Sequence, residues 1–162
     1  MVFIRNNITS VVVFVVLSFE FATCQKYVVV KEPANWFQSL INCKSAGMEL
    51  ASVNSKEETN RLQKFLTDNG YKAGYWLAGT KLGDGQYYWA TTGAKVVYTN
   101  WLVGQPDDAK MDYNNNEGEH CIQLGMPTYS PEPNGWNDVG CHSHLPYICQ
   151  SSEICYESND IL

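Results

Sequence analysis

The sequence has no basic cluster and none of the short motifs that mark common enzymes. With 11 Lys and Arg against 17 Asp and Glu in 162 residues, its formal net charge is −6. This balance argues against nucleic acid or an anionic membrane surface as the partner. The chain also lacks a Cys-x-x-Cys pair, a nucleophile elbow and a phosphate-binding loop. Thiolate zinc sites, serine hydrolases and nucleotide-dependent enzymes are therefore poor candidates.

An apolar run of membrane-spanning length is also absent. The run Val11–Leu17 follows Arg5 and precedes the small residues Ala22-Thr23-Cys24. Spanning a bilayer takes about 20 apolar residues, so a membrane anchor is disfavoured and we expect no membrane insertion. The pattern instead predicts a secretory signal peptide at residues 1–24. Residues 25–162 are then expected to form one extracellular domain with a short C-terminal tail.

Hydrophobic periodicity predicts two helices in the first half of the mature chain. The β-branched run after Tyr27 favours a first strand. Helical spacing predicts a helix over Asn35–Gly47 with Cys43 on its inner face. Ser55 and Glu58 form a capping-box pattern, which predicts a second helix that runs to about Asp68.

The second half has short extended runs in place of helical periodicity. They are separated by turn residues such as glycine and asparagine. The expected strands are Tyr75–Gly79, Tyr87–Trp89, Val96–Tyr98, Cys121–Leu124 and Tyr147–Cys149. Two helices followed by several short strands predict an α+β fold.

One stretch, from Gly104 to Asp138, concentrates side chains with hard oxygen atoms. These side chains are Gln105, Asp107, Glu119, Asn137 and Asp138. Calcium takes about six to eight oxygen ligands from carboxylates, amides, backbone carbonyls and water. Three carboxylates and two amides would neutralise Ca2+ and leave positions open for a hydroxylated ligand. This stretch therefore predicts a calcium-dependent sugar-binding site.

The chain resembles the C-type lectin-like domain family through a series of motifs in a fixed order. The motifs are Trp36 with Cys43, Gly47–Ala51, Trp76–Gly79, Asn100-Trp101, Gln105-Pro106-Asp107, Glu119-His120-Cys121, Trp136-Asn137-Asp138 and Tyr147–Cys149. The chain looks most like the small secreted lectins of insects. The resemblance implies a double-loop fold of two helices and short antiparallel strands, without enzymatic activity. It also implies the disulfides Cys43–Cys149 and Cys121–Cys141.

The same resemblance implies which sugar is bound. In this family Gln-Pro-Asp, here Gln105-Pro106-Asp107, marks galactose-type recognition, and the bond into Pro106 is cis. The five oxygen-bearing residues are expected to hold calcium and to contact the sugar together. Tyr113, the one aromatic residue of the loop Asp108–Gly118, is either a platform for the apolar face of galactose or a solvated loop residue. Glycans with galactose-type termini are the expected partners.

Three other readings compete with this one. A calcium-independent, protein-binding domain of the same fold is the alternative, although all five ligand positions are filled. A secreted metal hydrolase would use His120, His142 and His144, whose spacing lets the last two share one face of a strand; surface or loop histidines are favoured. Glu132-Pro133-Asn134 spells the family's mannose motif, but its prolines favour an ordinary turn.

The remaining cysteines raise the question of oligomeric state. Cleavage after Cys24 leaves five cysteines, and the two implied disulfides use four of them. Cys155 would then be free to form a disulfide-linked homodimer. Cleavage before Cys24 would instead allow a Cys24–Cys155 bond within one chain.

Overall fold

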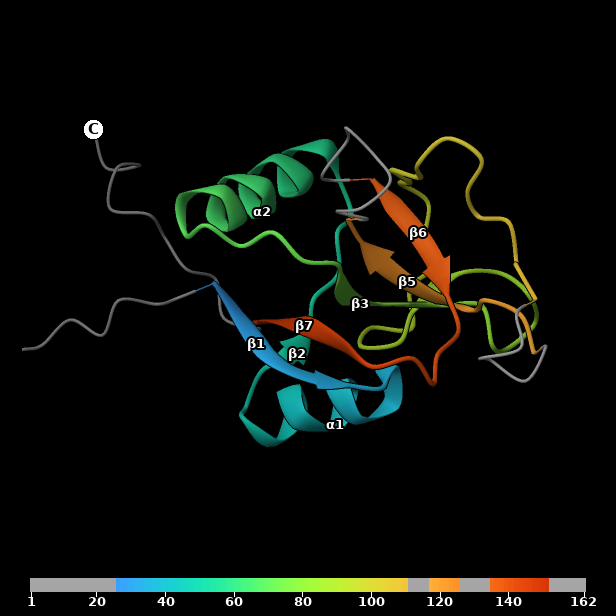
Figure 1. Ribbon diagram of the computed structural model, residues 1–162, viewed down its shortest axis with the longest axis horizontal. Coiled ribbons are helices and arrows are strands. Elements are labelled where there is room, and N and C mark those ends of the chain that lie inside the picture. Colours follow the sequence, from blue (N-terminus) through green and yellow to red (C-terminus); the bar gives the residue numbers. More distant parts are fainter. Residues whose placement is uncertain (1–25, 111–116, 126–134, 152–162) are drawn as a thin grey trace, which may run out of the picture.

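The structure, a computed structural model, describes residues 26–110, 117–125 and 135–151 (Figure 1). The chain forms β1 (Tyr27–Ala34), α1 (Trp36–Ser45), β2 (Glu49–Leu50), α2 (Lys56–Asp68), β3 (Tyr75–Thr80), β4 (Tyr88–Trp89), β5 (Cys121–Leu124), β6 (Trp136–Val139) and β7 (Leu145–Gln150). The two predicted helices precede most of the strands, so the predicted α+β fold is confirmed.

The strands join into one sheet with the order β1-β7-β3-β5-β6, with β2 beside β7 and β4 beside β3. The expectation of antiparallel strands is wrong for one pair of described strands. Strands β3 and β7 are parallel, with Trp76 beside Tyr147. Parallel neighbours need a long connection between them, and most of the second half of the chain lies between these two strands. β7 thereby comes to lie between β1 and β3.

Both helices begin at a capping residue, and for α2 it is the predicted Ser55. The Asn35 side chain accepts a hydrogen bond from the Gln38 amide, and Ser55 accepts one from the Glu58 amide. The Glu58 carboxylate reaches back to the Asn54 amide at 2.7 Å, one residue earlier than the capping box places it. Figure 1 shows α1 and α2 on opposite sides of β1 and β7. Their buried faces therefore close the core from two directions.

Two segments of the second half differ from the sequence prediction. The predicted strand Val96–Tyr98 is wrong: only Lys95 forms an isolated bridge, with Tyr88. Tyr98 instead packs its ring edge-on against Trp136 at 5.8 Å, so packing on the core replaces strand pairing. The segment Trp136–Val139 was expected only as the end of the oxygen-rich stretch from Gly104 to Asp138, and it forms strand β6.

Trp136 anchors an aromatic cluster beside the loop that follows Trp101. Its indole is fully buried, and Trp89, Tyr98 and Trp101 pack against it at nearly right angles. Edge-to-face pairs of this kind add to the stabilisation from buried area. The cluster gives the loop that follows Trp101 a rigid base.

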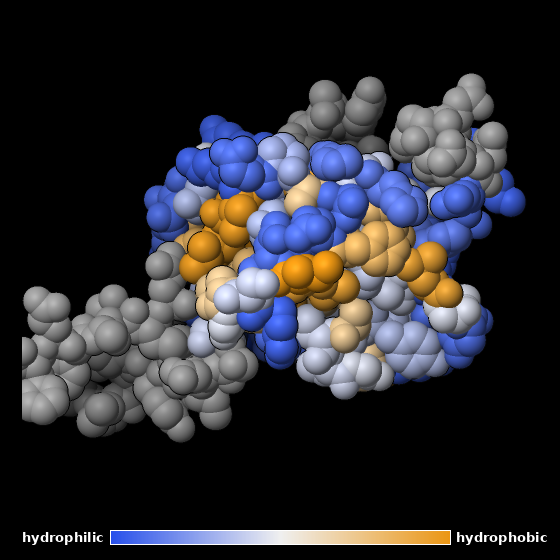
Figure 2. Space-filling view, turned by 90° about the horizontal axis from the view of Figure 1, so that it is seen from below, coloured by the Kyte–Doolittle hydropathy of each residue, from blue (hydrophilic) through white to orange (hydrophobic). Residues whose placement is uncertain are grey.

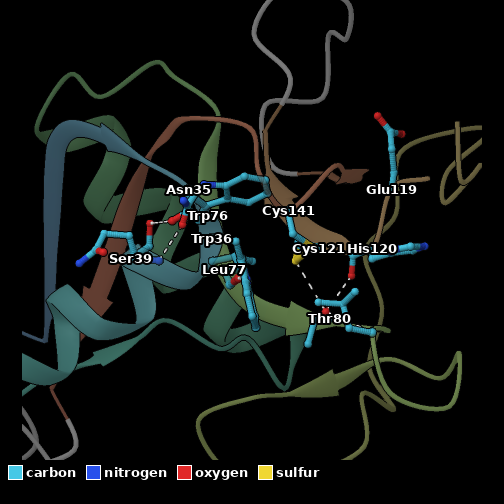
Figure 3. The surroundings of a disulfide bond; sticks show 12 residues. Asn35, Trp36, Ser39, Trp76, Leu77, Thr80, Glu119, His120, Cys121 and Cys141 are labelled. Carbon is cyan, nitrogen blue, oxygen red and sulfur yellow. Dashed lines mark hydrogen bonds between the residues drawn. A yellow bond between two sulfur atoms is a disulfide. The ribbon is translucent and has the colours of Figure 1, made fainter. Parts of the chain in front are cut away.

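Both disulfides implied by the resemblance are present. Cys43–Cys149 joins α1 to β7 with Cα atoms 5.4 Å apart. Cys121–Cys141 joins the start of β5 to the turn after β6 with Cα atoms 5.3 Å apart. Figure 3 shows the surroundings of Cys121, where the Thr80 hydroxyl donates to the His120 carbonyl at 3.0 Å.

The face drawn in Figure 2 carries both hydrophilic and hydrophobic residues. Figure 2 shows one face, on which hydrophobic residues form separate patches broken by hydrophilic ones. Exposed large apolar side chains include Phe37 and Ile41 of α1 and Val97 and Val103 of the loops. Within the described ranges, no helix has both the length and the apolar character that crossing a bilayer requires.

Several predictions concern residues outside the described ranges. These residues are Tyr113, the segment Glu132-Pro133-Asn134, and the cysteines Cys24 and Cys155. The roles given to them stay predictions.

Candidate metal centre

Three of the predicted ligand carboxylates converge at one place. Asp107, Glu119 and Asp138 each offer a carboxylate oxygen, and these oxygens lie within 4.8 Å of one another. They come from three segments: the loop after Pro106, the residues before β5, and β6 itself. Glu119 and Asp138 are buried while Asp107 is exposed, so the cluster opens to solvent on the Asp107 side.

Asp138 fixes the position of the loop. Its side chain is fully buried, yet both carboxylate oxygens have donors. Oδ1 accepts from the Asp107 amide at 3.0 Å and Oδ2 from the Asp108 amide at 2.9 Å. A carboxylate can accept about four hydrogen bonds or ligands, so these contacts leave it capacity for a cation.

Gln105 lies next to the carboxylates, because it shares a hydrogen-bond donor with Asp138. Its Oε1 accepts from the Asp107 N–H at 3.1 Å, the amide that also donates to Asp138. The Gln105–Pro106 bond is cis, as the resemblance implies. Gln105 and Asp107 therefore flank the proline beside the acidic cluster.

Asn137, the residue before Asp138 in β6, has a buried side-chain oxygen. The residue is only 4% exposed, and its Oδ1 has no hydrogen-bond partner among the described residues. A buried carbonyl oxygen ordinarily has a protein donor, a water or an ion as its partner. Three convergent carboxylates, with the Gln105 amide oxygen on the Asp107 N–H beside them, form a donor set of the kind that suits a hard divalent cation such as calcium. On this test the residues present fit the ion.

Asp108 and Lys81 belong to the site although sequence reasoning left them out of it. Asp108 has a positive φ of 52°, a conformation that aspartate tolerates better than most residues. Its Oδ1 accepts from the Glu119 amide at 3.1 Å and lies 3.1 Å from the Lys81 ammonium. Burial opposes ionisation, but the hydrogen bond and charge of Lys81 and the Glu119 amide lower the pKa of Asp108 below its ordinary value.

Tyr87 lies beneath the cluster and was also missed. Its hydroxyl is buried. Burial first, and then the charges of Asp138, Asp108 and Glu119, raise the pKa of Tyr87 well above its ordinary value. The tyrosine therefore stays neutral and adds no negative charge to the site. Tyr87 and Lys81 follow β3 and are distant in sequence from the predicted ligands. Only the fold brings them to the cluster, so no local sequence pattern indicates them.

The histidines do not converge on a metal site. His142 and His144 are exposed, and a hydrogen bond from Ser143 N to Gly140 O closes a turn there, so the expectation of strand spacing is wrong. The His120 side chain is 28% exposed, with Nε2 3.5 Å from Asp108 Oδ1. Surface or loop positions, the favoured prediction, are confirmed. In Figure 3 the neighbouring Glu119 side chain points away from the disulfide.

Comparison with known proteins defines the class to which this fold and site belong. The profile of the lectin C-type domain matches residues 32–151. The chain therefore belongs to the C-type lectin domain family. Members of this family are generally carbohydrate-binding proteins without enzymatic activity, and they typically bind Ca2+.

Similar proteins are found among insect lectins. C-type lectin 37Da of Drosophila melanogaster is 33% identical over 131 residues, which cover 77% of this chain and 67% of that protein. Salivary C-type lectin 2 of Aedes albopictus is 30% identical, over 77% of this chain and 82% of that protein.

A solved structure extends the likeness to three dimensions. The cow C-type carbohydrate-recognition domain of CD23, solved in the presence of a GlcNAc2Man3 oligosaccharide, has a TM-score of 0.62 and 27% identity. The match covers 81% of this chain and 92% of that domain. Fold and sequence thus agree on the family.

Proposed function

We propose that this chain is a secreted, calcium-dependent lectin that binds glycans with terminal galactose or N-acetylgalactosamine. The observation that carries the proposal is the convergence of the Asp107, Glu119 and Asp138 carboxylates within 4.8 Å. Three carboxylates brought together from distant segments repel one another. A bound divalent cation offsets that repulsion.

Five residues are assigned to the site: Gln105, Asp107, Glu119, Asn137 and Asp138. A bound calcium ion would supply an electrophilic centre at which two neighbouring sugar hydroxyls replace water. The residues of the chain orient that pair of hydroxyls. Carboxylate oxygens accept hydrogen bonds from them, whereas the amide nitrogen of Gln105 or Asn137 donates to them.

The order of amide and carboxylate around Pro106 sets the proposed specificity. Gln105 places a donor on one side of the proline, and Asp107 places an acceptor on the other. Exchanging the two groups would reverse this polarity, and a hydroxyl pair of the opposite stereochemistry would then fit. The galactose preference rests on this order, with Tyr113 proposed as a platform for the apolar face of the sugar.

One observation favours the alternative, a calcium-independent domain that binds protein. The Lys81 ammonium lies 3.5 Å from Asp138 Oδ2 and already offsets part of the negative charge. In that case the loop would keep its shape without metal, and its exposed residues would contact a protein partner.

Processing and assembly complete the proposal. Residues 1–24 are proposed to be removed as a signal peptide, and residues 25–162 to be secreted as one domain. One of the similar insect proteins is named a salivary lectin, which agrees with secretion. A homodimer linked through Cys155 would present two sugar sites and raise avidity for clustered glycans.

Calorimetry tests the function directly. The wild-type protein is titrated with calcium, and the calcium-loaded protein is then titrated with galactose and with mannose. We expect calcium binding, followed by stronger binding of galactose than of mannose. Asp107→Ala should lose both steps, while Glu57→Ala, which removes an exposed carboxylate from α2, should keep both. Heat of calcium binding unchanged in Asp107→Ala would contradict the proposed ligand set.

A further inference from the structure

A positive charge lies inside the acidic cluster. Lys81 directly follows β3, and its ammonium lies 3.1 Å from Asp108 Oδ1 and 3.5 Å from Asp138 Oδ2. The Lys81 side chain is only 15% exposed. Its ammonium also lies 5.6 Å from the centroid of the Tyr87 ring, within the range of a cation–π contact. Burial and three contacts fix this lysine in place, unlike an ordinary surface lysine.

Lys81 contacts two carboxylate oxygens that also accept hydrogen bonds around the loop Gln105–Lys110, here called the ligand loop. Asp138 Oδ2 accepts the Asp108 amide at 2.9 Å. Asp108 Oδ1 accepts the Glu119 amide at 3.1 Å. One ammonium thus joins the end of β3 to Asp108 and to β6, and through Asp108 to Glu119, two residues before β5.

The charge balance of the cluster calls for such a cation. Asp107, Asp108, Glu119 and Asp138 place four carboxylates in one small region of the molecule. Like charges at close range oppose one another's ionisation and push the segments that carry them apart. Removing the partner of a buried carboxylate strongly destabilises the folded protein. Lys81 lies between two of the four, Asp108 and Asp138, and His120 Nε2 lies 3.5 Å from the same Asp108 oxygen.

We propose that Lys81 is an internal cation that holds the ligand loop in its calcium-binding arrangement while no metal is bound. It is a positioning residue: it acts through Asp108 and Asp138, and the proposal rests on the calcium site proposed above. A site that is already arranged loses less entropy when it binds. Because the ammonium lies beside Asp108 and Asp138, it offsets part of the negative charge of the cluster.

The test compares Lys81→Met, Lys81→Arg and Lys110→Met in chelator and in calcium. Lys110→Met removes a charge from an exposed position of the same loop and controls for net charge. In chelator, Lys81→Met should lower Tm by about 3–8 °C and speed amide exchange in residues 105–110 about tenfold. Saturating calcium should restore most of both losses. Lys81→Arg and Lys110→Met should resemble the wild type.

The result separates this proposal from its rivals. If Lys81→Met loses the same Tm with and without calcium, Lys81 is merely structural. If Lys110→Met loses as much Tm as Lys81→Met, only net charge matters. Either result overturns the proposal, and so does an unchanged Tm in Lys81→Met. If Lys81→Met is not recovered folded, Lys81→Gln replaces it.

Failure of the calcium site itself is recognised separately. If calcium does not raise the Tm of the wild type, the proposed function is wrong. Amide exchange measured in chelator then shows whether Lys81 holds the loop, independently of calcium. Faster exchange at 105–110 in Lys81→Met but not in Lys81→Arg supports the lysine as the holding group, and equal exchange overturns it.

Discussion

The body of the domain and its ligand loop are held together by different forces. The body consists of α1, α2 and the strands β1, β3 and β7, whose core residues, such as Trp76, Leu77 and Ile148, are fully buried. The loop from Gln105 to Lys110 has no helix or strand. Two contacts hold the loop instead: its backbone amides donate hydrogen bonds to Asp138, and the Lys81 ammonium pairs with Asp108 and Asp138. Stability therefore resides mainly in the body, and the loop is the proposed place of ligand recognition, so mutations should separate the two.

The largest effect is expected from the disulfide of the body. Cys43→Ala with Cys149→Ala opens a loop with a sequence separation of 106 and should cost about 5 kcal/mol of unfolding free energy in the chain-entropy model. Cys121→Ala with Cys141→Ala, at a separation of 20, should cost about 3 kcal/mol. Urea unfolding measures both. A greater loss from the second pair would contradict the assignment of stability to the body.

Asp138→Asn should affect both regions, since Asp138 is a strand residue that also fixes the loop. The substitution keeps the shape of the side chain but removes its charge and one acceptor oxygen. We expect a loss of about 1.5–3 kcal/mol, the range for a hydrogen bond to a charged group. Calcium binding should be lost as well. Thermal unfolding in chelator, followed by calcium titration, measures the two effects, and a variant that binds calcium normally would remove Asp138 from the ligand set.

Asp107→Ala should affect the loop alone. Its side chain is exposed, and its one described hydrogen bond, from the Ala109 amide, is long at 3.3 Å. Unfolding free energy in chelator should change by no more than about 0.5 kcal/mol. The stabilisation that calcium gives to the wild type should disappear. A large drop in unfolding free energy in chelator would contradict the prediction that Asp107 acts in the loop alone.

The smallest effect on stability is expected from exchanging the specificity motif. Gln105→Glu with Asp107→Asn keeps one amide and one carboxylate around Pro106, so stability and calcium affinity should stay close to wild type. Competition by free sugars should shift from galactose toward mannose, because donors and acceptors change places. Unchanged galactose preference in the exchanged variant would show that the specificity lies elsewhere in the loop.

The same division explains what the sequence could predict. Helices α1 and α2 were predicted because their signals are local: apolar spacing for α1 and the capping box at Ser55 for α2. Strand β6 was missed because Asn137 and Asp138 are residue types depleted in strands. Tertiary packing on Trp136 and β5 overrides that tendency. The parallel pairing of β3 with β7 has no local signal either.

At the site, the motifs identified the residue types but not their supporting contacts. Asp107, Glu119 and Asp138 were named from their oxygen chemistry, and the structure brings all three together. Lys81 could not be found in this way, because a lone lysine after a strand is usually solvated. Only its approach to Asp108 and Asp138 reveals it. Charge compensation inside a cluster is a property of the fold.

A glycan array run with calcium and repeated with chelator tests the central claim most directly. The wild-type protein should bind glycans that end in galactose or N-acetylgalactosamine when calcium is present, and chelator should abolish that binding. Binding that persists in chelator, or binding in calcium confined to mannose-terminated glycans, would contradict a calcium-dependent, galactose-type lectin.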